Sequence, residues 1–316
     1  MLPLRRHTKT VSIGSIKIGG NEPIRIQSML TCDTTDVDSC VEEITRLDAV
    51  DCEIIRLTVP NQKSVDSVPL IRKKMRNRGI ERPIVADVHF NPNLAVNVCE
   101  FVDKVRINPG NYADRKKFES IDYTDYQYNK EIERLRNKFL PLVTICKEND
   151  TAMRIGTNHG SLSDRILSRY GDTPLGMVES ALEFLRICNS ENFHQIVLSM
   201  KSSNPIVMVE AYRLLVHCMY NEGMDYPLHL GITESGSFVP GSIKSSIGLG
   251  TLLLDGIGDT IRISLSDDPV KEVKIGNEIL KSLNLRNRGV RIISCPSCAR
   301  QGFQVIDTVK ILEDKL

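Results

Sequence analysis

Cationic side chains stand near the ends of five separate strand-like runs of the sequence. They are Arg56, Arg106, Arg154, Lys201 and Arg262. One arginine in such a place is most often solvated or paired with a carboxylate. Five cations that converge on one opening of the fold, its mouth, are hard to explain in that way. Guanidinium groups match the geometry of phosphate oxygens, so a ring of them indicates a polyanion, most simply a diphosphate. We expect these side chains to line a wet mouth.

Other polar residues end the same runs. Asp87 and His89 alternate along one strand and therefore face the same way, where they either bond each other inside a barrel or contact a substrate. Glu234 ends a strand beside a loop rich in Gly and Ser, among cations that would keep it ionised, and is a candidate for proton transfer. That loop leads into a helix N-terminus, which favours an anion. The further polar residues at strand ends are Asn158 and Ser264.

Two cysteines near the end of the sequence give a second chemical signal. Cys295 and Cys298 form the sequence CPSC. This spacing alone is compatible with zinc, a redox dithiol, half of an iron–sulfur site, or no function. A zinc site needs a second pair of ligands and an iron–sulfur cluster needs a third and usually a fourth, and none follows them in the sequence. Most other cysteines are interpreted as small core residues: Cys40, Cys52, Cys99, Cys146, Cys188 and Cys218.

Composition narrows the class of protein. The chain has 316 residues, of which 41% are hydrophobic, enough for one large domain or a large and a small one. A net charge of +1 gives no indication of nucleic acid or of a membrane surface as a partner. No apolar run is long enough to span a membrane or act as a signal peptide. Nine cysteines, an odd number, favour a reducing compartment, so we expect a cytoplasmic protein.

The strand-like runs alternate with helix-like runs of period near 3.6, which predicts a (β/α)8 barrel. In this fold the active site lies at the carboxyl ends of the strands, where the cations stand. A doubly wound open sheet is the alternative, but no Gly-rich turn follows the first strand. A hairpin over Val11–Ile18 precedes the barrel and is placed to plug its bottom. The predicted strands are Ile24–Met29, Glu53–Val59, Pro83–Phe90, Lys104–Asn108, Ala152–Thr157, Gln195–Met200, Pro227–Ile232 and Thr260–Leu265.

Two segments depart from the alternation. Residues 112–150 are longer than one connection needs and include a helical pattern. After Asp268 the sequence predicts a helix over Val270–Leu283, a strand over Val290–Ile293, the two cysteines and a final helix. We therefore expect a barrel over residues 1–267 and the start of a small α/β domain over residues 268–316.

The sequence resembles the 4-hydroxy-3-methylbut-2-enyl diphosphate synthase family, the iron–sulfur enzymes of the methylerythritol phosphate route to isoprenoids. The resemblance covers nearly the whole chain. The motifs that carry it are IRIQSM (24–29), DTTD (33–36), IIRLTVP (54–60), PIVADVHF (83–90), VRINPGN (105–111), MRIGTNHGSLS (153–163), GMVESALEF (176–184), SMKSSNP (199–205), YRLL (212–215), PLHLGITESG (227–236), KSSIGLGTLLLDGIGDTIRISL (244–265), LKSL (280–283) and SCPSC (294–298).

The resemblance implies a barrel that binds the cyclic diphosphate and a small C-terminal domain with a [4Fe–4S] cluster. It implies that Glu234 acts in proton transfer and that Cys295 and Cys298 are two cluster ligands. It also implies that the diphosphate is held by Arg56, Arg106, Arg154, Lys201 and Arg262, with help from His89, Asn158 and Ser264.

The implied reaction is the two-electron reductive ring opening of 2-C-methyl-D-erythritol 2,4-cyclodiphosphate, with loss of the C3 hydroxyl as water. The product is 4-hydroxy-3-methylbut-2-enyl diphosphate, and the electrons come from reduced flavodoxin or ferredoxin. A homodimer is implied because the cluster of one subunit approaches the barrel mouth of the other. If the source is plant-like, the location that the resemblance implies is the plastid stroma instead of the cytoplasm.

Two features differ from the family pattern. The family's third cysteine and its glutamate ligand lie in a CVVNGPGE-like stretch that the 316 residues do not contain. TNHGSLSDRI and the tyrosine-rich insertion are similar to the longer, three-domain branch of plants and some bacteria, yet about thirty residues separate RISL from SCPSC. One alternative is a non-catalytic remnant that binds the diphosphate or dimerises. Another is a cluster-free aldolase or isomerase, which Lys201, sharing its mouth with four arginines, does not favour.

Overall fold

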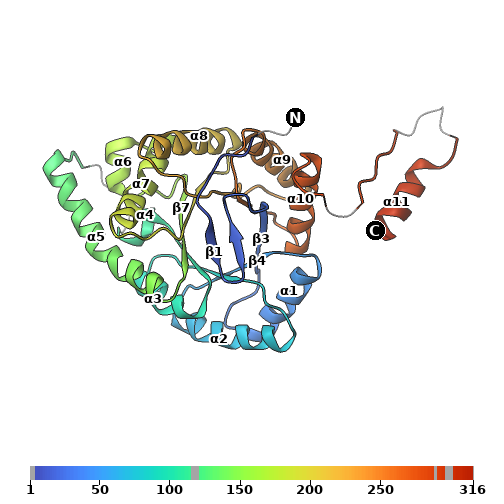
Figure 1. The fold of residues 1–316 in the computed structure, drawn as a ribbon, viewed down its shortest axis with the longest axis horizontal. Coiled ribbons are helices and arrows are strands. Elements are labelled where there is room, and N and C mark those ends of the chain that lie inside the picture. Colours follow the sequence, from blue (N-terminus) through green and yellow to red (C-terminus); the bar gives the residue numbers. More distant parts are fainter. Residues whose placement is uncertain (1–3, 115–120, 288–289, 296–301, 316) are drawn as a thin grey trace.

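The computed structural model of the chain describes residues 4–114, 121–287, 290–295 and 302–315. Eight parallel strands form one sheet in the order β8-β7-β6-β5-β4-β3-β10-β9 (Figure 1). A parallel bridge between Leu198 and Leu228 joins the two ends of this order, so the sheet closes on itself. The predicted (β/α)8 barrel is confirmed. Its strands are β3 (Arg25–Met29), β4 (Ile54–Thr58), β5 (Ile84–Asp87), β6 (Lys104–Ile107), β7 (Ala152–Asn158), β8 (Ile196–Lys201), β9 (His229–Leu230) and β10 (Thr260–Ile261).

The last two barrel strands are shorter than the sequence predicts. Pro227 has no N–H to donate to a ladder, although its carbonyl accepts from Leu198 N at 3.0 Å. Beyond β10, Arg262 N still donates to the Leu230 carbonyl at 2.9 Å. The extended backbone therefore continues past β9 and β10 through single hydrogen bonds, and the residues that follow still lie at the mouth.

Ten helices among the described residues surround or flank the barrel, and one more lies beyond it. Side chains of Asp36, Asn61, Thr124, Thr173 and Asn204 accept hydrogen bonds from backbone N–H groups in the first turns of their helices. The helices are α1 (Val37–Ala49), α2 (Gln62–Asn77), α3 (Pro92–Val98), α4 (Pro109–Tyr112), α5 (Asp125–Glu148), α6 (Asp164–Tyr170), α7 (Pro174–Ser190), α8 (Pro205–Asn221), α9 (Phe238–Leu254), α10 (Pro269–Ser282) and α11 (Val305–Lys315), with a 3-10 turn at Cys99–Phe101.

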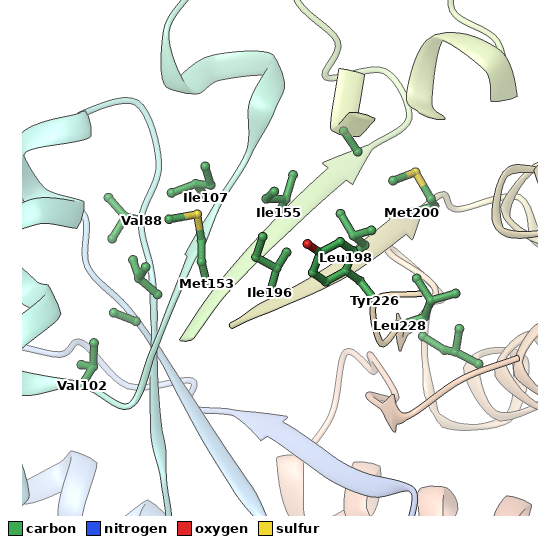
Figure 2. Close-up of a cluster of buried hydrophobic side chains, with 14 of the residues drawn as sticks. Val88, Val102, Ile107, Met153, Ile155, Ile196, Leu198, Met200, Tyr226 and Leu228 are labelled. Atoms are coloured by element: carbon green, nitrogen blue, oxygen red, sulfur yellow. The ribbon is translucent and has the colours of Figure 1, made fainter. Parts of the chain in front are cut away.

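The barrel strands separate apolar from polar residues by alternation. In β6, Val105 and Ile107 belong to the large core between the sheet and the helices, whereas Lys104 and Arg106 occupy the intervening positions. Figure 2 shows this outer core around β7 and β8, with Ile155 and Leu198 among its members. The alternation therefore directs the polar residues of each strand into the barrel interior.

The predicted hairpin is present and lies against one end of the barrel. It consists of β1 (Val11–Ile13) and β2 (Ile16–Ile18). Its buried residues pack with the barrel residues Ile54, Val85, Ala152 and Val197, which stand at or near the start of their strands. The amino-terminal end of the barrel is thus filled by apolar side chains, as the sequence predicts. None of the helices formed by the described residues is long and apolar enough to cross a membrane.

The segment after residue 267 begins as part of the barrel. Helix α10 packs against β3 and α1, and its Val273 and Leu280 belong to the same core as the barrel strands. We therefore propose that the barrel unit extends through α10 rather than ending at residue 267. The predicted strand over Val290–Ile293 is wrong, since these residues form no strand and pair with none of the strands that the described residues form. Helix α11 fits the predicted final helix and stands apart from the barrel in Figure 1.

Candidate anion-binding site in the barrel

Asp87 lies at the centre of the polar cluster. The Nη2 of Arg56 donates to its Oδ2, and the Nη1 of Arg106 donates to its Oδ1 at 3.0 Å. The Nε2 of His89 lies 3.1 Å from the same Oδ2, so Asp87 and His89 do contact each other inside the barrel. Burial raises the pKa of Asp87, but the two arginines outweigh it and hold the pKa well below its usual range. Asp87 is therefore an ionised counter-charge for two cations.

Arg106 joins three strands through its guanidinium group. Its Nη2 donates to the Gly156 carbonyl at 2.8 Å and to the Asn158 Oδ1 at 3.3 Å, and its Nη1 lies 2.7 Å from the His89 Nε2. A Cβ on Gly156 would stand 2.7 Å from the Arg106 Nε, so only glycine leaves room for this arrangement. The sequence predicts that Arg106, His89 and Asn158 meet, and the structure brings them together.

The expectation that the cations line a wet mouth is wrong. Arg154 is 1% exposed, Lys201 4% and Arg56 6%. No hydrogen-bond partner is found for the Nε and Nη1 of Arg154 within the described part of the chain. Burial, and then the charges of neighbouring arginines, lower the pKa of Arg154 and of Lys201 well below their ordinary values. The barrel therefore carries buried cationic groups whose hydrogen bonds the described residues supply only in part.

Arg262 has a partner that the sequence did not reveal. Its Nη2 lies 3.5 Å from the Oε1 of Glu272, which is buried on α10. The same carboxylate accepts from the Ser28 hydroxyl at 2.8 Å and from the Leu265 backbone N at 3.0 Å. Because the sequence assigned α10 to the second domain, Glu272 was not considered part of the barrel site.

Glu234 lies on the loop between β9 and α9. It is exposed and adopts a left-handed backbone conformation, with φ of 54°. The next residue, Ser235, donates through its hydroxyl to the Ser264 carbonyl, which ties this loop to the strand end after β10. Across the described ranges no ion pair links Glu234 to the five cations, so its position among them is not seen. Its role in proton transfer stays a prediction.

The cysteine pair cannot be assembled into a metal site from the described residues. Cys295 is exposed and free, and Cys298 lies outside the described residues. Where the structure is described, no three His, Cys, Asp or Glu side chains gather so that they could hold a metal ion. These residues therefore do not supply the donor set of a [4Fe–4S] cluster. The cysteines interpreted as core residues are buried, namely Cys40, Cys52, Cys99, Cys146 and Cys188, and Cys218 is half-buried.

Sequence reasoning missed several polar groups below the mouth. Lys104, Ser199 and His229 are fully or almost fully buried, and each has a side-chain polar atom without a partner among the described residues. The signal was present in the strand alternation, because Lys104 stands two positions before Arg106 on the same strand face. Lys104 stands at the start of its strand, so an interpretation limited to the carboxyl ends of the strands does not include it.

Solved structures with the same barrel fold share little sequence with this chain. A sialic acid synthetase from Leptospira borgpetersenii aligns with a TM-score of 0.54 at 12% identity, over 99% of this chain and 98% of that chain. A type I 3-dehydroquinate dehydratase from Clostridium difficile aligns with a TM-score of 0.55 at 11% identity, over 89% of this chain and 100% of that chain. At these identities the likeness shows the fold alone.

Curated relatives are much more similar in sequence. A protein from Leptospira interrogans named 4-hydroxy-3-methylbut-2-en-1-yl diphosphate synthase (flavodoxin) is 56% identical over 89% of this chain and 42% of its own length. One of the same name from Akkermansia muciniphila is 50% identical over 92% of this chain and 50% of its own length. A chloroplastic ferredoxin-dependent form from rice is 54% identical over 85% of this chain and 36% of its own length.

The chain thus spans half or less of the length of these relatives. The family description "GcpE TIM-barrel domain" matches residues 8–277, which include the first part of α10 with Glu272 and every residue of the cation cluster. The resemblance seen in the sequence motifs is therefore confirmed for the barrel, and the chain belongs to the family of the GcpE TIM-barrel domain.

Proposed function

We propose that this barrel binds 2-C-methyl-D-erythritol 2,4-cyclodiphosphate at the carboxyl ends of its strands. The observation that carries the proposal is the charge inside the barrel. Five cations at the strand ends, with Lys104 beneath them, face two carboxylates, Asp87 and Glu272, which leaves an excess of four positive charges when every group is ionised. Burial disfavours that excess in the ligand-free state, and a bound diphosphate would compensate it.

The reaction supported best is the reductive ring opening of this diphosphate to 4-hydroxy-3-methylbut-2-enyl diphosphate. Two electrons enter, the C2–oxygen bond to phosphate breaks, the C3 hydroxyl takes up a proton and leaves as water, and a double bond forms between C2 and C3. The arginines and Lys201 hold the phosphate groups, and Asn158, His89 and Ser264 fix their orientation. Relatives that are 50–56% identical over most of this chain carry the name of this synthase.

Glu234 is proposed to pass the proton. Its carboxylate stands on the loop that Ser235 ties to the strand end after β10, so it is exposed beside the mouth rather than locked in an ion pair. Glu234→Gln should leave diphosphate binding intact in this chain. It should cut turnover sharply when the chain is joined to the remaining length of its relatives. Near-normal turnover with an artificial reductant would remove Glu234 from the mechanism.

The finer features of the whole protein are also proposals. Electrons would come from flavodoxin or ferredoxin, which the relatives' names include, through a [4Fe–4S] cluster with Cys295 and Cys298 as two of its ligands. A homodimer in the cytoplasm, or in the plastid stroma of a plant-like source, is proposed from the family resemblance. Exposed apolar residues on α9 support self-association, among them Val239, Ile243 and Ile247.

Isothermal titration calorimetry on the 316-residue chain tests the binding proposal. We expect the cyclic diphosphate to bind and 2-C-methyl-D-erythritol, which has the same carbon skeleton without phosphate, to show no heat of binding. Inorganic pyrophosphate should compete, because the cations recognise phosphate oxygens. The proposal is abandoned if the cyclic diphosphate does not bind, or if the polyol binds equally well.

A further inference from the structure

Lys104 is the deepest cation of the barrel that the described residues show. It is the first residue of β6 and is 0% exposed. Its register neighbours are Val85 on β5 and Ala152 on β7, which both pack with the apolar hairpin plug. Lys104 therefore stands at the boundary between the apolar bottom of the barrel and the polar cluster above.

Among the described residues, no carboxylate pairs with the Lys104 ammonium. No hydrogen-bond partner is found for its Nζ among the described residues. The charged groups that act on it are Arg154 on β7 and Arg56 on β4, and both repel it. Burial, followed by these two arginines, lowers the pKa of Lys104 well below its ordinary value.

The imidazole of His229, near Lys104, does not compensate the charge of the Lys104 ammonium. The Nδ1 of His229 lies 2.7 Å from the Thr260 Oγ1, and its Nε2 has no partner within the described ranges. Burial, and then the charges of Arg154, Lys201 and Lys104, lower the pKa of His229 well below the usual value. The carboxylate at the centre of the cluster, Asp87, is already shared by Arg56 and Arg106.

A buried, unpaired amine does not stabilise the ligand-free fold. An apolar side chain of similar length, such as methionine, would fill the same space without the desolvation cost. The benefit of Lys104 must therefore come in a state that carries a negative charge near the cluster. A diphosphate bound at the mouth provides that charge, and the low-dielectric interior transmits the attraction over a longer distance than water would.

We propose that Lys104 is a positioning residue for anion binding, a cation held beneath Arg154 that strengthens the hold of the mouth on a diphosphate. This inference rests on the proposed binding function of the barrel. Lys104 acts through the field it adds below Arg154 and Arg56, whereas those arginines contact the phosphate groups themselves. The desolvation of the unpaired Lys104 side chain lowers the stability of the ligand-free protein.

Lys104→Met tests the proposal, with Lys17→Met as the matched control. Lys17→Met is the same change of residue type at an exposed position of β2, on the hairpin that closes the end of the barrel away from the mouth. We expect Lys104→Met to raise the melting temperature of the ligand-free chain and to weaken the affinity for the cyclic diphosphate by about tenfold. Lys17→Met should leave both quantities unchanged. A merely structural lysine would lower stability when replaced and would not move the two readouts in opposite directions.

The outcomes separate this inference from the proposed function. Unchanged affinity in Lys104→Met, with the wild-type chain binding the cyclic diphosphate, overturns the role of Lys104 and leaves the binding function standing. No binding of the cyclic diphosphate or pyrophosphate by the wild-type chain overturns both. If Lys104→Met does not fold, Lys104→Gln, which keeps a polar end but no charge, is measured in the same way. A folded Lys104→Gln with wild-type affinity also overturns the inference.

Discussion

At the scale of single residues, the cation cluster contains two kinds of arginine. Arg56 donates to Asp87, whereas Arg154 has no partner for two of its nitrogen atoms within the described residues. Both are almost completely buried. Removing one member of a buried pair leaves a charge uncompensated, but removing an unpaired cation does not. The two residues should therefore affect stability differently even where they serve the same ligand.

We predict that Arg56→Ala and Arg154→Ala each weaken binding of the cyclic diphosphate by about 1.5–3 kcal/mol, the scale of a hydrogen bond to a charged group. Their effects on stability should differ. Arg56→Ala lowers the free energy of unfolding because the Asp87 carboxylate loses one of its two arginines and keeps Arg106 and the His89 imidazole, and Arg154→Ala lowers it less. Calorimetry and thermal melts of the two variants check this. Equal losses of stability would show that Arg154 is paired in solution, and unchanged affinity in both would remove them from the site.

The lowered pKa of Asp87 predicts how the stability of the folded chain depends on pH. Its pKa in the folded chain lies well below the ordinary value, because Arg56 and Arg106 outweigh burial. A group with a depressed folded pKa adds stability above its unfolded pKa, and this contribution is lost as the pH falls toward the folded pKa. We expect the chain to lose stability below about pH 4. Asp87→Asn should be less stable at neutral pH. Its free energy of unfolding, measured with urea, should fall less steeply than that of the wild type as the pH is lowered (the acid limb of the profile). Parallel acid limbs would contradict the assignment.

At the scale of elements, the strand ends were the most predictable part of the molecule. Apolar runs interrupted by single polar residues mark the strands, because in a barrel every second residue faces inward. This pattern predicts that Arg106 lies beside His89 and Asn158, which agrees with their hydrogen bonds in the structure. It did not show how deep the cations lie, since depth depends on how the strands stagger and on how loops cover the mouth. It also missed Glu272, whose partner is on the strand end after β10.

The hairpin is the element on which the lower half of the barrel depends. Ile13 is 0% exposed and packs in the cluster that closes the amino-terminal end. We predict that Ile13→Ala lowers the free energy of unfolding by about 2–5 kcal/mol, the range for truncating a large buried aliphatic residue. Affinity for the cyclic diphosphate in the folded fraction should not change, because the plug and the mouth are at opposite ends. Urea denaturation and calorimetry measure the two effects. A comparable loss of affinity would mean that the plug positions the cations.

At the scale of the whole molecule, the barrel was predictable and the segment after it was not. Helix α10 follows β10, as at least one helix follows each of the other barrel strands, but the change of pattern after Asp268 concealed that relation. Val290–Ile293 has the residue types of a strand, yet a strand needs an edge to pair with, and the described residues offer none there. Cys295 consequently stands on an exposed segment apart from the barrel.

The last prediction concerns the cluster. We expect the 316-residue chain to bind the cyclic diphosphate but not to hold a stable [4Fe–4S] centre. Cys295 and Cys298 can supply two thiolates, whereas four ligands are the norm. The remaining cysteines lie in the barrel, where burial raises the pKa of Cys52, for example, to about 12 and disfavours the thiolate that binds metal. A ligand pair without a preformed site gains little affinity.

Iron and acid-labile sulfide analysis after anaerobic reconstitution measures this directly, with diphosphate binding as the control for a folded barrel. Cys295→Ala should leave the small iron content of the chain almost unchanged, since that iron is bound non-specifically. Joining the chain to the remaining length of a relative should restore the brown chromophore, and there Cys295→Ala should abolish it. A 316-residue chain that reconstitutes near four irons and loses them in Cys295→Ala would show that the barrel itself completes the cluster.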